Sequence, residues 1–215
     1  MLKLERTAVM NMDNAIRGAR NPMNSWSRMD SYTDGEGKFV FGPNDLDLAR
    51  RLARAGTDHR KFLRMIFVSV DVTAPLYWWK EYDTYKVATV ANSTSTMHKI
   101  TSKEFSMDDF SYDHMTEQTA AFFATIVAKL EELRLAYLAE SDPDRKKVIW
   151  YDIIQLLPSS YNQMRTLTFN YETLINIYKA RRFHKLAEWH TFCDWIETLP
   201  YAEDLITFPL SESKS

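Results

Sequence analysis

The stretch DVTAPLYWWKEYDTYKVATVANSTSTMHK, residues 71–99, combines two properties that rarely occur together in one segment. It is rich in tryptophan and tyrosine, as a buried segment would be, yet it also carries lysine, glutamate, aspartate and histidine side chains. From Asn92 to Thr96 it consists of hydroxyl and amide side chains. This mixture suits a pocket that stacks a planar ring and forms hydrogen bonds with a polar ligand. An amphipathic helix followed by a polar turn is the alternative interpretation.

The segment before this stretch predicts a strand. From Phe62 to Thr73, β-branched residues dominate and alternate with other side chains. Pro75 ends the strand and suits the first position of a helix that would carry Tyr77 and Glu81. The predicted strand therefore leads directly into the aromatic and polar stretch.

The rest of the chain is mainly helical in its pattern, with a further short strand expected in residues 1–10. Helices are predicted to begin at Asp13 or Asn14, at Asn44, near Thr116, at Asp142, at Ser159 or Ser160 (running to about Arg182) and near Leu186. Residues 27–42 suggest a flexible loop and residues 208–215 a frayed tail. We therefore expect an α+β fold, with helices packed on a small mixed or antiparallel sheet, in a single domain over residues 1–215.

Composition narrows the classes of function. Apolar residues make up 45 % of the 215 residues and glycine only 5 positions, which favours a helical protein with a sizeable core. The net charge of −2 gives no indication of nucleic-acid or membrane binding. The single cysteine, Cys193, fits the reducing cytoplasm, where we place the protein. His184 and His190 lie six residues apart, which does not match a zinc pair on a helix, so no metal is expected.

Two arginines near the N-terminus, Arg17 and Arg20, lie three residues apart and would share a helix face. Such a pair can bind a phosphate group or can form a solvated basic face. The sequence leaves both alternatives open.

Several anchors, in order and at similar spacing, resemble one family, the flavin-dependent thymidylate synthases, over about residues 10–195. The anchors are Ala15 to Arg20, Gly56, His59, Ala74-Pro75, Thr84-Tyr85-Lys86, Pro158, Asn170, Arg181 and Glu188-Trp189. The resemblance implies a diverged, FAD-dependent methyltransferase of nucleotide biosynthesis. Such an enzyme converts dUMP to dTMP with methylenetetrahydrofolate and NADPH as co-substrates, and it is a homotetramer whose site is built between subunits.

The resemblance also implies roles for individual residues. His59, Thr84, Tyr85, Lys86 and Asn170 would bind the flavin. Glu81, Asn92, Ser93, Thr94, Ser95 and Arg181 would bind the nucleotide. Arg181 would also be catalytic, because a guanidinium at a pyrimidine carbonyl stabilises negative charge that develops on the ring. A helix C-terminus, which favours a basic residue, is the structural alternative for Arg181.

The chain departs from the family pattern where the family carries cations. The Arg-His-Arg triplet is replaced by Thr84-Tyr85-Lys86, and other family arginines fall on Thr96, near Ile154 and on Glu172. These departures keep two further hypotheses open: a flavin- or nucleotide-binding protein of the same fold without synthase activity, and a structural homo-oligomer.

Overall fold

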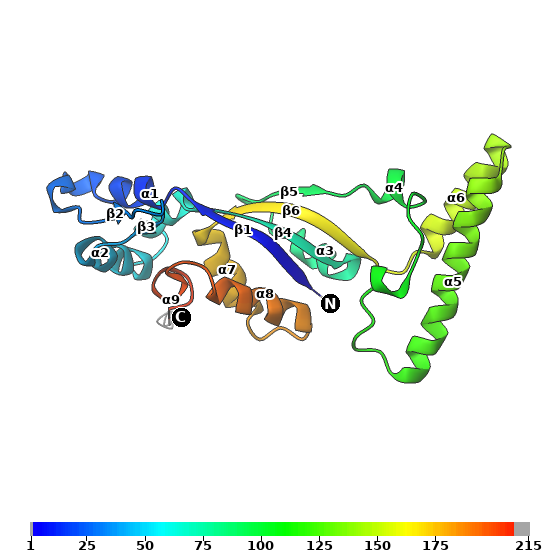
Figure 1. Ribbon diagram of the computed structural model, residues 1–215. Helices are drawn as coiled ribbons and strands as arrows, with labels where there is room; N and C mark the ends of the chain where they lie inside the picture. Colours follow the sequence, from blue (N-terminus) through cyan, green and yellow to red (C-terminus); the bar gives the residue numbers. More distant parts are fainter. Residues whose placement is uncertain (1, 209–215) are drawn as a thin grey trace. The chain divides into compact units, whose positions relative to one another are not determined.

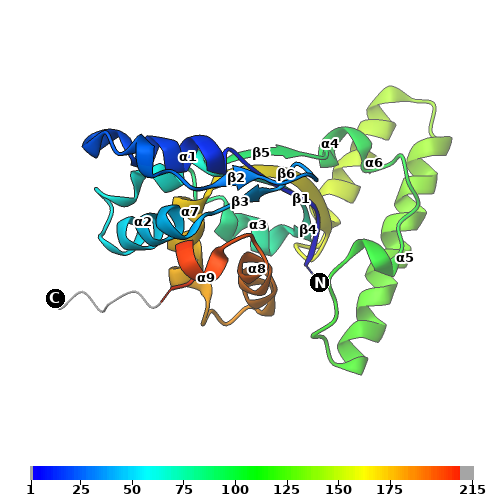
Figure 2. The same ribbon diagram turned by 60° about the vertical axis from the view of Figure 1, so that its left-hand side comes forward.

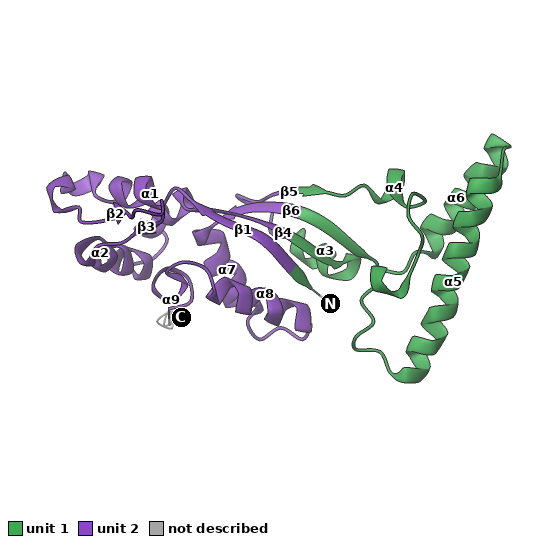
Figure 3. Cartoon of the chain, in the orientation of Figure 1, with its two compact units in different colours: residues 1–3, 72–84, 92–165 green, residues 4–71, 85–91, 166–215 purple. Residues whose placement is uncertain are grey.

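The computed structural model describes residues 2–208, and within them the chain is α+β, as the sequence predicted (Figure 1). The chain divides into two compact units, coloured separately in Figure 3. Unit 1 comprises residues 1–3, 72–84 and 92–165, and unit 2 comprises residues 4–71, 85–91 and 166–215. Each unit is therefore assembled from segments that are distant in the sequence.

The main sheet is small and antiparallel. Its strands follow the order β1 (Lys3–Met10), β4 (Phe67–Pro75), β6 (Asn162–Asn170) and β5 (Val90–Ser93). In β4, Val68, Val70, Val72 and Ala74 are all buried, so the alternation that predicted this strand is confirmed. All four strands contribute residues to both units.

The start of the strand predicted from Phe62 is wrong. Arg60–Met65 is a 3-10 helix, and β4 begins only at Phe67. Phe62 and its neighbour Leu63 are both buried. Adjacent buried side chains suit a tight helical turn better than a strand with one covered face, since strand side chains alternate between the two faces.

The helix predicted from Ser159 or Ser160 to Arg182 is wrong in its first half. Residues Asn162–Asn170 form β6, and the helix α7 covers only Tyr171–Arg181. The buried positions of β6 are Gln163, Leu167, Phe169 and Asn170. A polar residue at the first buried position obscured the period-two apolar pattern that predicts a strand.

Unit 1 contains four α-helices within its described residues. They are α3 (Leu76–Tyr82), α4 (Thr96–Lys99), α5 (Glu117–Ala139) and α6 (Pro143–Leu156), with a 3-10 helix at Met107–Asp109. Helices α5 and α6 lie side by side in both views (Figures 1 and 2). Phe123, Val127 and Leu130 of α5 are buried in one core with Ile153 of α6. The predicted starts of α5 and α6 are confirmed, because the side chains of Thr116 and Asp142 cap them.

Unit 2 contains the remaining α-helices of the described chain. They are α1 (Met12–Ala19), α2 (Pro43–Arg54), α7, α8 (Ala187–Glu197) and α9 (Ala202–Leu205), with 3-10 helices at Asn21–Met23, Trp26–Arg28 and Arg60–Met65. Two predicted N-caps are wrong. Helix α1 is preceded by Asn11, and α2 follows Gly42, with Asn44 inside its first turn. The distant Asp30 carboxylate accepts from the N–H groups of Asn44 and Asp45 at 2.8 and 3.0 Å and so caps α2.

Residues 27–42, predicted as a flexible loop, contain a small hairpin. Strands β2 (Tyr32–Thr33) and β3 (Phe39–Val40) pair antiparallel. The Asp34 carboxylate accepts from the N–H groups of Glu36 and Lys38 and closes the turn. Of the predicted frayed tail, Phe208 is described and buried, and residues 209–215 lie outside the described residues.

Candidate active site

Arg181 and Tyr85, which are 96 positions apart in the sequence, meet in unit 2. The Nε of Arg181 donates a hydrogen bond of 2.8 Å to the Tyr85 hydroxyl. The guanidinium lies 4.8 Å from the ring centre of Trp189 and 5.5 Å from that of Tyr85. The centres of the two rings are 6.0 Å apart and the ring planes are inclined at 68°. We call these three residues the Arg181 cluster.

The local sequence explains why the Arg181 cluster forms. Arg181 is the last residue of α7, and Trp189 lies in the first turn of α8, so a short connection brings them together. Trp189 is fully buried and provides a fixed surface for the guanidinium. Cation–π contacts on two rings and one hydrogen bond hold the planar guanidinium in a defined orientation.

The other two residues of the Thr84-Tyr85-Lys86 triplet have different surroundings from Tyr85. The Thr84 hydroxyl donates to the Glu81 carbonyl oxygen at 2.8 Å and so ends helix α3. Lys86 has an exposed side chain. The unit boundary falls between Thr84 and Tyr85, so Glu81 and Thr84 belong to unit 1 while Tyr85 and Lys86 belong to unit 2.

The predicted nucleotide-binding loop, Asn92 to Ser95, lies in unit 1 and has two different halves. Asn92 and Ser93 form the exposed end of β5. The next two side chains make internal hydrogen bonds: Thr94 donates through its hydroxyl to the Met164 carbonyl oxygen at 3.2 Å, and the Ser95 hydroxyl caps α4 by accepting from the His98 N–H. These two hydroxyls therefore hold the loop in shape.

Asn170 is buried at the start of α7, where its side chain accepts from the Thr173 N–H at 2.9 Å. It and Arg181 lie at opposite ends of this helix, which separates them by about 16 Å along the helix axis. The helix thus does not bring these two predicted site residues together.

His59 lies between α2 and the 3-10 helix Arg60–Met65, shortly after Gly56, whose φ of +98° favours glycine. His59 borders a cavity of about 610 Å³ in unit 2. The cavity is also lined by Gly18, Ala19, Asn21, Pro22, Met23, Leu48, Leu52, Asp58, Lys61, Phe62 and Met65. One histidine and one lysine thus border a largely apolar hollow.

Glu172, which the resemblance aligns with a family arginine, is buried and paired with two arginines. Its carboxylate lies 3.2 Å from Nε of Arg60 and also contacts Arg64. The cations at this point of unit 2 therefore come from the segment that follows His59.

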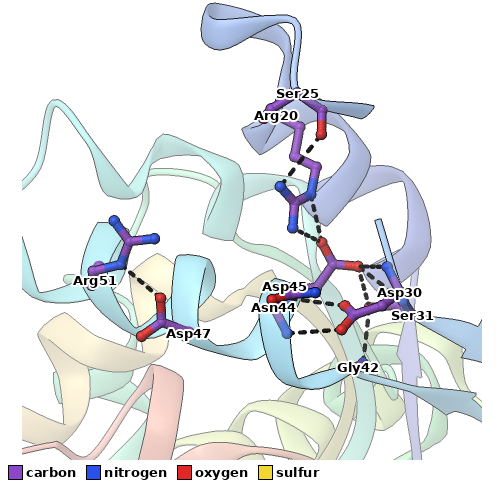
Figure 4. A network of polar contacts seen from close by, with 9 residues as sticks. All are labelled: Arg20, Ser25, Asp30, Ser31, Gly42, Asn44, Asp45, Asp47 and Arg51. Atoms are coloured by element: carbon purple, nitrogen blue, oxygen red, sulfur yellow. Dashed lines mark hydrogen bonds and ion pairs between the residues drawn. The ribbon is translucent and has the colours of Figure 1, made fainter. Parts of the chain in front are cut away.

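Both alternatives for Arg17 and Arg20, a phosphate site and a solvated basic face, are wrong for Arg20. Arg20 is 4 % exposed and pairs at 2.6 Å with the fully buried Asp45 (Figure 4). Asp45 also accepts from the Ser31 hydroxyl at 2.6 Å and from two backbone N–H groups. Burial raises the pKa of this carboxyl, but the hydrogen bonds from Ser31, Arg20 and the backbone lower the pKa by more, so that it lies below its usual value.

The sequence reasoning missed Arg165 of β6. In unit 1 its guanidinium lies 4.2 Å from the Trp79 ring centre and its Nη1 lies 2.7 Å from the Asp83 carboxylate. Its Nε donates to the Gln163 side-chain oxygen at 3.0 Å. Only recognition of β6 as a strand could have placed Arg165 beside the aromatic helix α3.

Two further features of the described residues bear on metal and thiol chemistry. No group of three His, Cys, Asp or Glu side chains among residues 2–208 could hold a metal ion. None of the helices described here has the length and apolar character needed to cross a bilayer. Cys193 is buried, and burial raises the pKa of its thiol to about 12, so the thiol stays protonated and is a poor nucleophile near neutral pH.

Comparison with known proteins gives similarity at the level of structure. No protein-family model matches the sequence, and no curated protein matches it. A structure of thymidylate synthase X from Helicobacter pylori with FAD and dUMP has a TM-score of 0.67 at 16 % identity, covering 96 % of this chain and 98 % of that chain. A second structure of that enzyme with FAD and dUMP has a TM-score of 0.68 at 16 % identity, covering 95 % and 98 %.

A third similar structure is the UMP/dUMP methylase PolB from Streptomyces cacaoi, bound with 5-Br dUMP. Its TM-score is 0.59 at 13 % identity, and 92 % of this chain and 89 % of that chain are covered. The agreement extends over nearly the whole length of all these chains. This chain therefore resembles the flavin-dependent thymidylate synthases and has their fold.

Proposed function

We propose that this protein binds FAD and dUMP and converts dUMP to dTMP, with NADPH and methylenetetrahydrofolate as co-substrates. The observation that carries this proposal is the Arg181 cluster. Tyr85 and Arg181 are anchors of the resemblance that lie 96 positions apart, and the fold brings the predicted flavin-binding and pyrimidine-binding residues into direct contact. The similar structures, which hold FAD and dUMP, support the same assignment.

The residues present fit a flavin in unit 2. Tyr85 offers an aromatic ring and a hydroxyl group beside the Arg181 guanidinium, and the next residue, Lys86, offers an exposed cation. The cavity beside His59 combines apolar walls with Lys61, which suits a ring system linked to a phosphate group. We assign His59, Tyr85, Lys86 and Asn170, together with Thr84 of unit 1, to flavin binding. The flavin would supply hydride when bound.

Arg181 is the residue to which we assign a role in the chemistry. A guanidinium directed at a pyrimidine carbonyl stabilises negative charge as it develops on the ring. Tyr85 and Trp189 fix the orientation of this guanidinium in advance, so little reorganisation is needed during reaction.

We assign the nucleotide to a second group of residues, which lie in unit 1: Glu81, Asn92, Ser93, Thr94 and Ser95. Asn92 and Ser93 are exposed and can donate to a ligand. Thr94 and Ser95 act by shaping the loop, because their hydroxyls are bound internally. We further propose a homotetramer, because the resemblance implies a site completed between subunits.

A second candidate function is binding of flavin or nucleotide without synthesis. It is favoured by Glu172, which places a carboxylate at a family arginine position and offsets one of the two positive charges of Arg60 and Arg64. A dianionic ligand would then meet fewer cations, and each charge-assisted hydrogen bond contributes about 1.5–3 kcal/mol.

The first experiment is the absorption spectrum of the purified protein between about 350 and 500 nm, with identification by mass of any molecule released on denaturation. We expect bound or readily added FAD, and then oxidation of the reduced flavin that depends on dUMP, methylenetetrahydrofolate being present. A protein that neither contains nor takes up FAD would refute the synthase and the flavin-binding form of the second function. Bound FAD without this oxidation would refute the synthase and leave the binding protein.

The matched variants are Arg181→Ala and Arg182→Ala. Arg182 is the neighbouring arginine and pairs with Asp194 at 2.8 Å, outside the Arg181 cluster. We expect loss of turnover only in Arg181→Ala. Equal turnover in both variants would remove Arg181 from the mechanism.

A further inference from the structure

A series of hydrogen bonds within unit 1 joins strand β6 to the segment that follows Asn92 and Ser93. Its centre is the buried residue Gln163. The Gln163 Nε2 donates to the Thr94 carbonyl oxygen at 2.9 Å and to the Thr96 hydroxyl oxygen at 3.2 Å. An amide nitrogen of this kind carries two hydrogens, so both of them are used on this segment.

Arg165 sets the orientation of the Gln163 amide. It lies two positions further along β6, on the same face of the strand, and its Nε donates to Gln163 Oε1 at 3.0 Å. A guanidinium has no acceptor atom, so an amide turned by 180° would lose this bond and would present its oxygen to the Thr94 carbonyl oxygen. Arg165 therefore keeps the donating side of Gln163 directed at residues 94–96.

Helix α3 in turn supports both residues through Trp79. The Trp79 Nε1 donates to the Gln163 carbonyl oxygen at 2.9 Å, and the Trp79 ring centre lies 4.2 Å from the Arg165 guanidinium. The Asp83 carboxylate, just after α3, accepts from Arg165 Nη1 at 2.7 Å. Since Trp79 is itself only 1 % exposed, Gln163 and Arg165 rest on a fixed part of the core.

The segment that these residues hold is exposed and polar. Asn92, Ser93 and Thr94 are all exposed, and Thr94 is also bonded to β6 through its N–H and hydroxyl, which donate to the Met164 carbonyl oxygen at 3.0 and 3.2 Å. A loop that is ordered before its ligand arrives loses less conformational entropy on binding than a loop that must become ordered. Gln163 is buried, so it would influence a ligand through this loop.

We propose that Gln163 and Arg165 are positioning residues that hold residues 94–96 in the conformation that receives the nucleotide. The identity of the ligand rests on the proposed function, whereas the hold on the loop rests on the hydrogen bonds alone. Asn92 and Ser93, to which we assign nucleotide contacts, then start from a fixed main chain.

The first test removes the amide without changing the charge. Gln163→Met keeps an unbranched side chain of similar length but cannot donate to Thr94 or Thr96. Gln155→Met, at an exposed position of α6 in the same unit, is the matched control. In calorimetric titrations with FAD present, we expect the Kd for dUMP to rise about tenfold in Gln163→Met only, which is comparable to the loss of one hydrogen bond. The Kd for FAD should stay unchanged in both variants. An unchanged Kd for dUMP, or equal losses for dUMP and FAD, would overturn the proposal.

The second test concerns Arg165. Arg165→Lys keeps the charge near Asp83 but loses the Nε donor to Gln163, and Arg134→Lys, at an arginine paired with Glu131 at 2.6 Å, is its control. We expect weaker dUMP binding in Arg165→Lys only. Because Arg165 acts through Gln163, adding Arg165→Lys to Gln163→Met should cause no further loss. Additive losses in the double variant would overturn the role of Arg165.

A third measurement needs no ligand. Amide hydrogen exchange, followed by mass spectrometry, should become faster for residues 94–100 in Gln163→Met and remain as in the parent in Gln155→Met. Unchanged exchange in Gln163→Met would overturn the positioning role whether or not dUMP binds. A parent protein that binds no dUMP would refute the proposed function, and faster exchange in Gln163→Met would still support the hold on the loop.

Discussion

Arg181 owes its proposed role to the shape of its guanidinium as well as to its charge. Lysine keeps the charge but loses the planar fork that fits between Tyr85 and Trp189. Arg181→Lys is therefore expected to slow dUMP-dependent flavin oxidation by about 10- to 100-fold, equivalent to one charge-assisted hydrogen bond. Arg182→Lys serves as the control, and equal rates in the two variants would show that charge alone suffices.

The ion pair of Arg20 and Asp45 is a structural feature that can be measured separately. Asp45→Ala leaves the Arg20 guanidinium buried without its carboxylate, which is expected to lower the free energy of unfolding by about 3–5 kcal/mol. Asp47, two residues further along α2, pairs with Arg51 at 2.9 Å on the surface (Figure 4). Asp47→Ala should lower the free energy of unfolding by less than about 1 kcal/mol. Urea titration of both variants measures the two losses. Similar losses of unfolding free energy in Asp45→Ala and Asp47→Ala would contradict the distinction between a buried and a surface ion pair.

The Asp45 carboxylate also predicts that the stability of the protein depends on pH. Because the pKa of Asp45 is lower in the folded protein than its value of about 3.9 in the unfolded chain, its contribution is complete above about pH 4 to 5. This contribution is lost as the pH falls through the folded pKa. Asp45→Asn cannot titrate, so its unfolding free energy should fall less steeply below about pH 4 than that of the parent. Parallel curves would refute the assignment.

At the scale of single residues, the resemblance predicted Tyr85 and Arg181 as site residues, and the fold brings these two residues together. It could not show that Trp189 fixes the guanidinium, because α7 and α8 need not pack in that way for either helix to form. It also could not decide the state of Arg20. A buried pair and a solvated face have the same spacing in the sequence, and only the position of Asp45 distinguishes them.

Among the elements, the long helices were the most predictable. Local signals determine where α6 begins: Asp142 caps it and Pro143 occupies its first position. The strand β6 was not predictable from apolar alternation, because Gln163 is buried at its start. The Gln163 amide donates to the Thr94 carbonyl oxygen at 2.9 Å, a partner that only the folded chain supplies.

The capping of α6 gives a prediction for that element. The Asp142 carboxylate accepts from the Arg145 N–H at 2.9 Å, so Asp142→Ala should destabilise the protein by about 1 kcal/mol. Ser141→Ala, one residue earlier, removes no side-chain cap and should have little effect. Thermal unfolding of both variants checks this, and an unchanged midpoint for Asp142→Ala would contradict it.

For the whole molecule, the sequence predicted the α+β class and the family resemblance, because strands, helices and anchors lie in a recognisable order. It did not predict the two compact units, since no linker in the sequence marks their boundary. Chain segments far apart in the sequence must fold together before either unit exists, and this information lies in tertiary contacts.

The proposed homotetramer is a prediction at the same scale. Light scattering should give four times the mass of one chain, and the tetramer should persist in Arg181→Ala, because that variant changes the proposed chemistry. A monomer that still carries out dUMP-dependent flavin oxidation would contradict a site completed between subunits.

The chain passes between the two units after residues 3, 71, 84, 91 and 165, five times in all. Genetic recombination exchanges contiguous stretches of coding sequence, and the longest uninterrupted part of unit 1 still ends within a shared strand, β6. No single exchange between two genes could replace one unit and leave the other intact.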